Sequence, residues 1–132
     1  MLPAVGDSAR LRKRIMDADV QLFAQLSLDT NPAHLDEEFA ATTRFGRRIC
    51  HGLLYASFIS AVIGTQLPGP GSIYMSQTLK FHRPVFAGDE IEAIVTVTSV
   101  LPQRAVVILT TECFNQDGVL VLSGEATILA PA

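Results

Sequence analysis

The chain has 132 residues, of which 48% are hydrophobic and 17% charged, and its formal net charge at pH 7 is -3. This length suits a single domain, predicted to span residues 1–132, and this composition excludes an intrinsically disordered chain. The weak negative charge argues against a protein that binds nucleic acid or a membrane surface, so a nucleotide-bearing ligand requires a local basic patch.

The amino terminus and the cysteines predict the compartment. Residues 1–7 lack the basic segment and the apolar stretch of a secretory signal peptide. The two cysteines, Cys50 and Cys113, lie far apart and form no Cys-x-x-Cys pair. Both observations favour a cytoplasmic protein with reduced thiols over one with a disulfide.

The first third of the chain predicts one short strand and several helices. Residues 9–16 have the character of a short, exposed strand that carries charges. Residues 17–28 repeat apolar side chains at helical spacing, and residues 36–43 predict a second, short helix. Between them, Asn31-Pro32 marks a turn or the start of another short helix.

Residues 51–65 form the most hydrophobic stretch, since between residues 53 and 63 only Ser57 and Ser60 are not apolar. A helix that is apolar nearly all round is expected to be buried all round. This helix is shorter than the roughly 20 apolar residues that cross a bilayer, so we expect a core helix enclosed by other elements. Ser57, Ser60 and Gly64 fall on one side of it, where a backbone or a polar group could approach closely.

The second half of the chain predicts β-structure. Gly and Pro residues at 67–71 end the central helix, and the segments that follow are strand-like, at residues 72–85, 90–101, 104–115 and 119–129. In residues 72–85 and 90–101 the side chains are predicted to alternate between the two sides of a strand. The predicted fold class is α+β, with an antiparallel sheet of about five strands curled around the central helix. Because such a sheet has open edges, we expect a two-fold dimer that continues the sheet across the subunits.

Asp29 and His34 lie on either side of the Asn31-Pro32 turn, and such a kink can bring a carboxylate and an imidazole into one small volume. Adding water to a double bond, or removing it, requires two groups that handle protons on one face of the substrate. Histidine has the unperturbed pKa best suited to this task. The alternative is that Asp29 caps a turn and that His34 is an ordinary surface residue.

Cys50, His51 and Gly52 precede the central helix. The Gly52 N–H can reach a ligand oxygen, as unpaired amides at a helix N-terminus do, or Gly52 only eases the chain into the helix. We interpret His51 as a residue at the helix start, and Cys50 as a small buried apolar residue rather than a nucleophile. The histidines and cysteines show no metal-binding spacing, so no metal site is expected.

Two basic clusters could contact phosphates. They are Arg44, Arg47 and Arg48 before the central helix, and Lys80, His82 and Arg83 before Pro84. The sequence alone favours a solvated face for both clusters, which is the common role of surface charges.

Five blocks of sequence, spread over almost the whole chain, point to a known family. They are Asp-Thr-Asn-Pro-Ala-His-Leu-Asp at 29–36, His-Gly-Leu-Leu at 51–54, Leu-Pro-Gly-Pro-Gly-Ser-Ile-Tyr at 67–74, Phe-His-Arg-Pro-Val-Phe-Ala-Gly-Asp at 81–89 and Ser-Gly-Glu-Ala at 123–126. In this order they resemble the MaoC-like (R)-specific enoyl-CoA hydratases. The resemblance is strongest to the short bacterial enzymes that feed polyhydroxyalkanoate synthesis from fatty-acid oxidation.

The resemblance implies a hot-dog fold, in which an antiparallel sheet wraps a long central helix, and a homodimer. It implies that Asp29 and His34 are the catalytic pair and that the Gly52 backbone N–H forms the oxyanion hole. Ser60 and Asn31 are implied as supporting residues.

The assignment of Ser60 has an alternative in Ser57, one turn away. Candidate contacts to the CoA phosphates are Lys80, Arg83 and Arg47, and no cofactor or metal is implied. One departure from the family pattern is the pair Arg47-Arg48 before Ile49, where relatives carry a proline; it puts the shape of this loop in doubt.

The implied activity is that of a hydro-lyase, the (R)-specific hydration of trans-2-enoyl-CoA to (R)-3-hydroxyacyl-CoA. Such an enzyme supplies monomers from fatty-acid β-oxidation to polyhydroxyalkanoate synthesis. Three alternatives stay open: a 3-hydroxyacyl-acyl-carrier-protein dehydratase of fatty-acid synthesis, an acyl-CoA thioesterase on the same fold, and a non-catalytic acyl-binding module. The sequence does not reveal the preferred acyl chain length.

Overall fold

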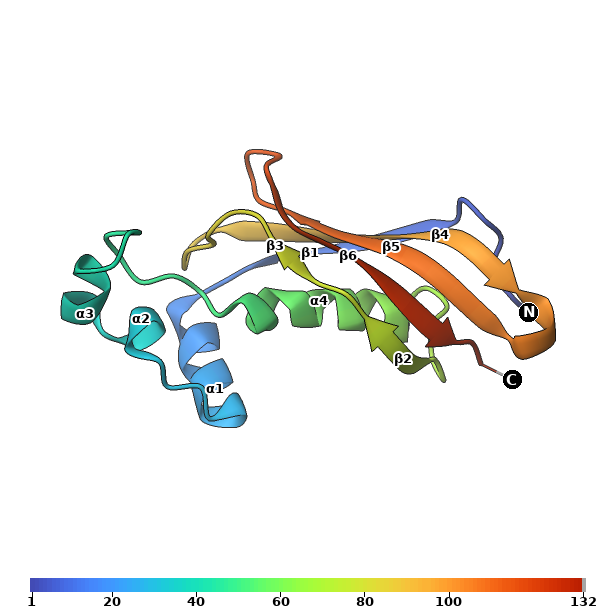
Figure 1. Ribbon diagram of the computed structural model, residues 1–132, viewed down its shortest axis with the longest axis horizontal. Helices are drawn as coiled ribbons and strands as arrows, with labels where there is room; N and C mark the ends of the chain where they lie inside the picture. Colours follow the sequence, from blue (N-terminus) through green and yellow to red (C-terminus); the bar gives the residue numbers. More distant parts are fainter. Residues whose placement is uncertain (132) are drawn as a thin grey trace.

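The computed structural model describes residues 1–131, in which six strands form one sheet beside four α-helices (Figure 1). Neighbouring strands are antiparallel, in the order β1-β4-β5-β6-β2, and β3 also pairs with β6. The strands are β1 Ser8–Arg14, β2 Ile73–Gln77, β3 Lys80–Phe81, β4 Glu90–Leu101, β5 Val106–Phe114 and β6 Leu120–Leu129. The helices are α1 Asp17–Ser27, α2 Pro32–Leu35, α3 Glu37–Ala41 and α4 Gly52–Thr65, with a 3₁₀ helix η1 at Pro102–Arg104.

The sheet lies along one side of α4, which confirms the predicted α+β hot-dog fold (Figure 1). The strand count is six rather than about five, because residues 72–85 form two short strands instead of one. A register shift between Tyr74 and Ser76 breaks the predicted alternation of β2. Beyond β2, the Thr78 N–H donates to the Glu125 carbonyl (2.9 Å), and the Thr78 carbonyl passes Gly124 so closely that a Cβ there would collide with it.

One face of α4 supplies much of the apolar core. The buried residues of this helix recur at helical spacing and are Leu54, Tyr55, Phe58, Ile59, Val62 and Ile63. They pack against buried strand residues such as Val95, Leu109 and Ile128 in one hydrophobic cluster. Burying aliphatic and aromatic side chains in this way is the main favourable contribution to folding.

The prediction that α4 is enclosed on all sides is wrong for the single chain. Leu53 is 60% exposed, and the small residues Ser57, Ser60 and Gly64 are exposed as well. The physical reason is that α4 packs against β4, β5 and β1, and a sheet covers only the side of a helix that faces it.

Burial along β4 alternates as predicted for residues 90–101. Ile91, Ala93, Val95 and Val97 are buried, and the residues between them are at least partly exposed. A register shift between Val97 and Ser99 then ends the alternation. Period-two burial is the expected pattern for a sheet that covers a core on one face.

The helices α1, α2 and α3 gather beyond the amino-terminal end of α4, and both chain ends lie at the opposite end of the molecule (Figure 1). Residues 28–51, which connect α1 to α4, therefore occupy the space where α4 begins. Across residues 1–131, every helix falls short of the length and hydropathy that crossing a membrane requires.

Candidate active site

Asp29 lies where α1 ends. Leu28 takes the left-handed backbone conformation (φ 68°) that commonly stops a helix. The Asp29 N–H donates to Ser27 Oγ (3.1 Å), and Asp29 Oδ1 accepts from the Asn31 N–H (3.2 Å). The Asn31 side chain then accepts from the Ala33 N–H (3.0 Å) and caps α2. Asp29 thus caps a turn, and the backbone N–H of Asn31 fixes the Asp29 carboxylate.

His34 lies in α2 and is 9% exposed, so it is not an ordinary surface residue. Its Nδ1 lies 2.7 Å from the Ile49 carbonyl oxygen, so Nδ1–H is the donor. In the neutral ring, Nε2 is then left as the proton acceptor. Burial lowers the pKa of His34 below its ordinary value, although the hydrogen bond to Ile49 acts in the opposite direction. The imidazole is therefore neutral at pH 7.

His51 contacts both of these residues. It is the N-cap residue of α4 and is 2% exposed. Its Nε2 lies 2.9 Å from the Asp29 carbonyl oxygen, and its ring stacks on His34 with 4.0 Å between centroids. Its Nδ1 is buried and has no hydrogen-bond partner in the part of the chain that the structure describes. The position of His51 at the helix start was predicted. Its contacts were not, because His34 and Asp29 lie far from it in the chain, and such distant pairs leave no pattern in the sequence.

The side chains of Asp29, His34 and His51 converge on one small volume. One carboxylate oxygen of Asp29 and one ring nitrogen each of His34 and His51 lie within 4.8 Å of one another. A water that makes two hydrogen bonds of about 2.8 Å spans nearly this distance. A separation within this limit allows Asp29 and His34 to hold a single water between a carboxylate and an imidazole.

The same residue types bind metal ions in other proteins, but the geometry here is poor for that purpose. The His34 and His51 rings are inclined by only 32° at a centroid distance of 4.0 Å. A metal such as zinc lies in the plane of each imidazole ligand at about 2.0–2.1 Å from nitrogen. Two nearly stacked planes do not meet so close to their nitrogens, so the arrangement suits a water better than a metal.

Gly52 is the first residue of α4 and forms one wall of a cavity of about 420 Å³. Asp29, His34 and Arg83 also line this cavity. No hydrogen bond within residues 1–131 uses the Gly52 N–H. A Cβ at Gly52 would lie 2.5 Å from Phe81 Cε1, so only glycine lets this ring rest against the start of the helix. An amide donor, a carboxylate and an imidazole thus face one cavity.

Residues 4–113 match the protein family described as the MaoC like domain. The chain belongs to this MaoC-like family.

Two relatives match over most of their own length. The chain is 54% identical over 127 residues to an (R)-specific enoyl-CoA hydratase from Rhodospirillum rubrum, which covers 96% of this chain and 88% of the relative. It is 52% identical over 127 residues to an (R)-specific enoyl-CoA hydratase from Aeromonas caviae, which covers 96% and 95%. The solved structure of an (R)-hydratase from A. caviae involved in PHA biosynthesis matches with a TM-score of 0.94 and 51% identity, over 98% of both chains.

Two serines of this MaoC-like chain lie away from the pair. Ser60 is on the exposed face of α4 and does not line the cavity, and no hydrogen bond within residues 1–131 joins it to Asp29. Ser57 donates back to the Leu54 carbonyl of its own helix. In the single chain neither serine supports Asp29 directly, because both point from the side of α4 that the sheet leaves open.

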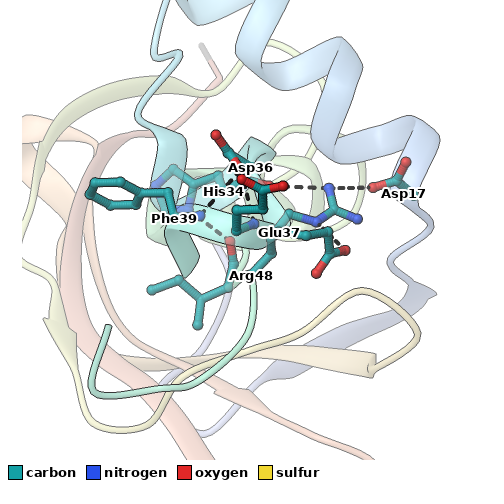
Figure 2. Close-up of polar contacts among 8 residues, drawn as sticks. Asp17, His34, Asp36, Glu37, Phe39 and Arg48 are labelled. Carbon is teal, nitrogen blue, oxygen red and sulfur yellow. Dashed lines mark hydrogen bonds and ion pairs between the residues drawn. The ribbon is translucent and has the colours of Figure 1, made fainter. Parts of the chain in front are cut away.

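The basic candidates for CoA phosphates separate in space. Arg83 lines the cavity, whereas Lys80 is exposed on β3 and does not line it. The Arg47 guanidinium lies over the Phe86 ring, 3.5 Å from its centroid, and lines a second cavity instead. Arg48 is bound in ion pairs with Asp17 and Glu37 (Figure 2), so it is not available to a phosphate.

Cys50 behaves as the small buried residue that the sequence predicted. It is 4% exposed, and burial raises the pKa of its thiol to about 12. Cys113 is fully buried, and neither cysteine is in a disulfide. A thiol held protonated in this way is a poor nucleophile.

Proposed function

We propose that this protein is an (R)-specific enoyl-CoA hydratase, a hydro-lyase that converts trans-2-enoyl-CoA to (R)-3-hydroxyacyl-CoA. The observation that carries the proposal is the spacing of Asp29 and His34 around one water position, in a cavity that also exposes the Gly52 N–H. The identity to two hydratases over 96% of this chain supports the same activity.

The substrate binds with its thioester oxygen at the Gly52 N–H. The amino-terminal end of α4 adds a partial positive charge there, because the aligned peptide dipoles of a helix make its first turn positive. Negative charge builds on this oxygen when a nucleophile attacks C3. A preorganised N–H donor at such an oxygen stabilises the transition state by about 3 kcal/mol.

Asp29 and His34 hold and activate the water. Asp29 accepts one O–H of the water, and Nε2 of neutral His34 accepts the other. The water oxygen bonds to C3 as its proton passes to His34, and the electrons of the C2–C3 double bond move onto the thioester oxygen. Protonated His34, stabilised by the Asp29 carboxylate, then returns a proton to C2 on the same face. The elements of water are added and the imidazole is neutral again, so we propose that no cofactor takes part.

The decisive experiment is hydration of trans-2-enoyl-CoA thioesters over a series of chain lengths, with the product resolved by chirality. We expect the conjugated enoyl absorbance to disappear and the product to be the (R)-3-hydroxyacyl thioester. An intact absorbance, or an (S) product, contradicts the proposal. The chain-length series also measures the acyl preference, which depends on how the far end of the cavity closes.

A carrier-protein dehydratase is the second candidate, because Arg44 and Arg47 are exposed in the loop before α4 and could face an acidic carrier. Arg48 no longer belongs to that patch, since two carboxylates neutralise it. Comparing CoA with acyl-carrier-protein thioesters at equal concentration decides between the two substrates. A thioesterase instead releases free thiol to a thiol reagent, and a non-catalytic binder retains the enoyl thioester unchanged.

We also propose that the protein works as a homodimer that covers the open side of α4 and the β2 edge of the sheet. The exposed apolar residues there are Leu53 on α4, Ile73 and Met75 on β2, and Phe81 on the neighbouring strand β3. Exposed apolar residues beside an unpaired strand edge favour association of two copies. We expect light scattering to give twice the mass of the chain, and Met75→Asp to shift it toward the single chain.

For the cellular role we propose a cytoplasmic enzyme that passes (R)-3-hydroxyacyl-CoA from fatty-acid oxidation to polyhydroxyalkanoate synthesis. The buried, unbonded cysteines suit a reducing compartment. Co-expression with a polyhydroxyalkanoate synthase in cells fed fatty acids is expected to increase polymer. The Asp29→Asn variant is the matched control, and equal polymer with both proteins argues against this role.

A further inference from the structure

Arg48 is a charged residue in the interior of the loop that leads to α4. Its side chain is 22% exposed, much less than either carboxylate partner. Its Nη1 lies 2.9 Å from Asp17 Oδ1 on α1, and its Nε lies 2.9 Å from Glu37 Oε1 on α3. The same Nη1 donates to the His34 carbonyl oxygen on α2 (3.3 Å). One guanidinium thus joins three helices (Figure 2).

The chemistry of these contacts suits arginine and not lysine. A planar guanidinium presents several N–H donors in fixed directions, whereas an ammonium is a point charge. The partner on α3 is also fixed, because Asp36 Oδ1 caps this helix by accepting from the Glu38 N–H (2.9 Å) and the Phe39 N–H (3.2 Å). Glu37 is therefore held at the first turn of α3, where it faces Arg48.

The residue after Arg48 holds the ring of His34. The Ile49 carbonyl accepts from His34 Nδ1–H at 2.7 Å, and the Ile49 N–H donates to the Ala33 carbonyl at 3.3 Å. The Cys50 N–H donates to the Val85 carbonyl at 2.7 Å and fixes the following peptide. The direction of the Ile49 carbonyl depends on both ends of this short segment, and Arg48 is the anchor at one end.

A second cavity, of about 180 Å³, touches His34 beside this anchor. Asp17, Glu37 and Arg48 line it, together with Ile49 and Cys50. Without the guanidinium this cavity opens more widely to water, and water competes for the Ile49 carbonyl. The charged and titratable groups near His34 are Asp29 and His51 in the first cavity, and Asp17, Glu37, Arg47, Arg48 and Cys50 in this second cavity.

We propose that Arg48 is a positioning residue for His34: by joining α1, α2 and α3 it fixes the Ile49 carbonyl, which selects the Nδ1–H form of the imidazole. Nε2 is thereby kept as the proton acceptor that faces the water. Arg48 itself touches neither substrate nor water. The inference rests on the proposed function only for its kinetic consequence.

The test compares Arg48→Met with Arg12→Met. Arg12 also pairs with a carboxylate, Glu92 (2.8 Å), but does so on the sheet away from the cavity, so its variant is the matched control. The first readout is the pair of ring ¹⁵N shifts of His34, which distinguish the two tautomers and are assigned by their loss in His34→Gln. The second readout is kcat and KM for hydration of crotonyl-CoA.

We expect Arg48→Met to lower kcat about tenfold, because small displacements of a catalytic group are costly, with KM changed less than about twofold. We expect its His34 nitrogens to show a mixture of tautomers. Arg12→Met is expected to keep the wild-type rate and the single Nδ1–H form. If Arg48→Met only lowers the melting temperature and leaves kcat and the tautomer as in wild type, the ion pairs are merely structural and the proposal is wrong.

Glu37→Gln provides a second variant in case Arg48→Met does not fold. The Glu37 side chain is 73% exposed, so its replacement removes one anchor of Arg48 without emptying any part of the core. A smaller loss of kcat and a partial tautomer change are expected, and wild-type behaviour in both readouts argues against the proposal. The nitrogen shifts need no substrate, so they decide the role of Arg48 even if the protein acts on a different thioester.

Discussion

The sheet with α4 and the end of the molecule that carries Asp29 and His34 are held together by different forces. Residues such as Leu109 and Ile59 are buried among other apolar side chains. Around Asp29 and His34 the contacts are hydrogen bonds and ion pairs, such as His34 to Ile49 and Arg48 to Glu37. The difference teaches that apolar burial holds the sheet against α4, whereas polar contacts position the side chains of the proposed site. We therefore expect substitutions to affect stability and turnover separately.

The largest effect is expected from Leu109→Ala on β5, where the side chain is fully buried. Loss of a buried leucine leaves a cavity and lowers the free energy of unfolding by about 2–5 kcal/mol. Denaturant unfolding measures this change, and kcat of the folded fraction is expected to stay near wild type. Leu26→Ala is the control, since Leu26 is 79% exposed on α1 and its loss should change stability by less than about 0.5 kcal/mol. Equal losses in both variants break the proposed separation.

Asp29→Asn should show the opposite behaviour. The amide still accepts from the Asn31 N–H, but it cannot hold and polarise the water as a carboxylate does. We expect turnover to fall by about 10² or more, with the melting temperature unchanged. Asp117→Asn, in the turn between β5 and β6, is the surface control for the loss of one charge. Hydration at a near-normal rate by Asp29→Asn refutes its catalytic role.

Gly52→Ala tests the contact between the start of α4 and Phe81. The new methyl group would lie 2.5 Å from Phe81 Cε1 and so displaces the ring into the substrate cavity. We expect kcat/KM to fall about tenfold through misplacement of the thioester, with little change in stability at an ordinary helical position. The double variant Gly52→Ala/Phe81→Leu should recover most of the rate. If the second substitution brings no recovery, the steric explanation is wrong.

The smallest effect is a dependence on pH. Since burial lowers the pKa of His34, kcat/KM should be flat near neutrality and fall on the acid side, with a midpoint below pH 6.5. At pH values between the folded-state pKa of His34 and 6.5, the unfolded chain binds more protons at His34 than the folded chain does. Burial of neutral His34 therefore leaves the free energy of unfolding at its full value above pH 6.5, and this free energy decreases as pH falls through the folded-state pKa of His34. His34→Gln should show a weaker acid loss of stability, and an unchanged loss would point to other groups.

The elements that depend on apolar periodicity could be predicted from the sequence. The helical spacing in residues 17–28 and the alternation in residues 90–101 gave α1 and β4 within one residue at each end. The break in residues 72–85 was missed, because it depends on how closely the Thr78 carbonyl passes Gly124 on a distant strand. The open side of α4 was missed because hydrophobicity does not tell which neighbour covers a face.

The candidate site divides in the same way. Asp29, Asn31 and His34 could be found because they lie within one turn and their order resembles a known family. The contacts of His51 with Asp29 and His34, and those of Arg48 with three helices, join residues that are distant in the chain. Such contacts arise from tertiary packing, and a single sequence records no spacing for them.

The burial of both cysteines gives the protein an internal reporter of its own opening. Burial raises the pKa of Cys50 and of Cys113 to about 12, so a thiol reagent should scarcely label the native chain. Labelling then proceeds only as fast as the molecule opens, and its rate measures how often the core becomes accessible. Because the two thiols are unreactive in the native chain, they add little background to an assay that detects thiol released from a thioester.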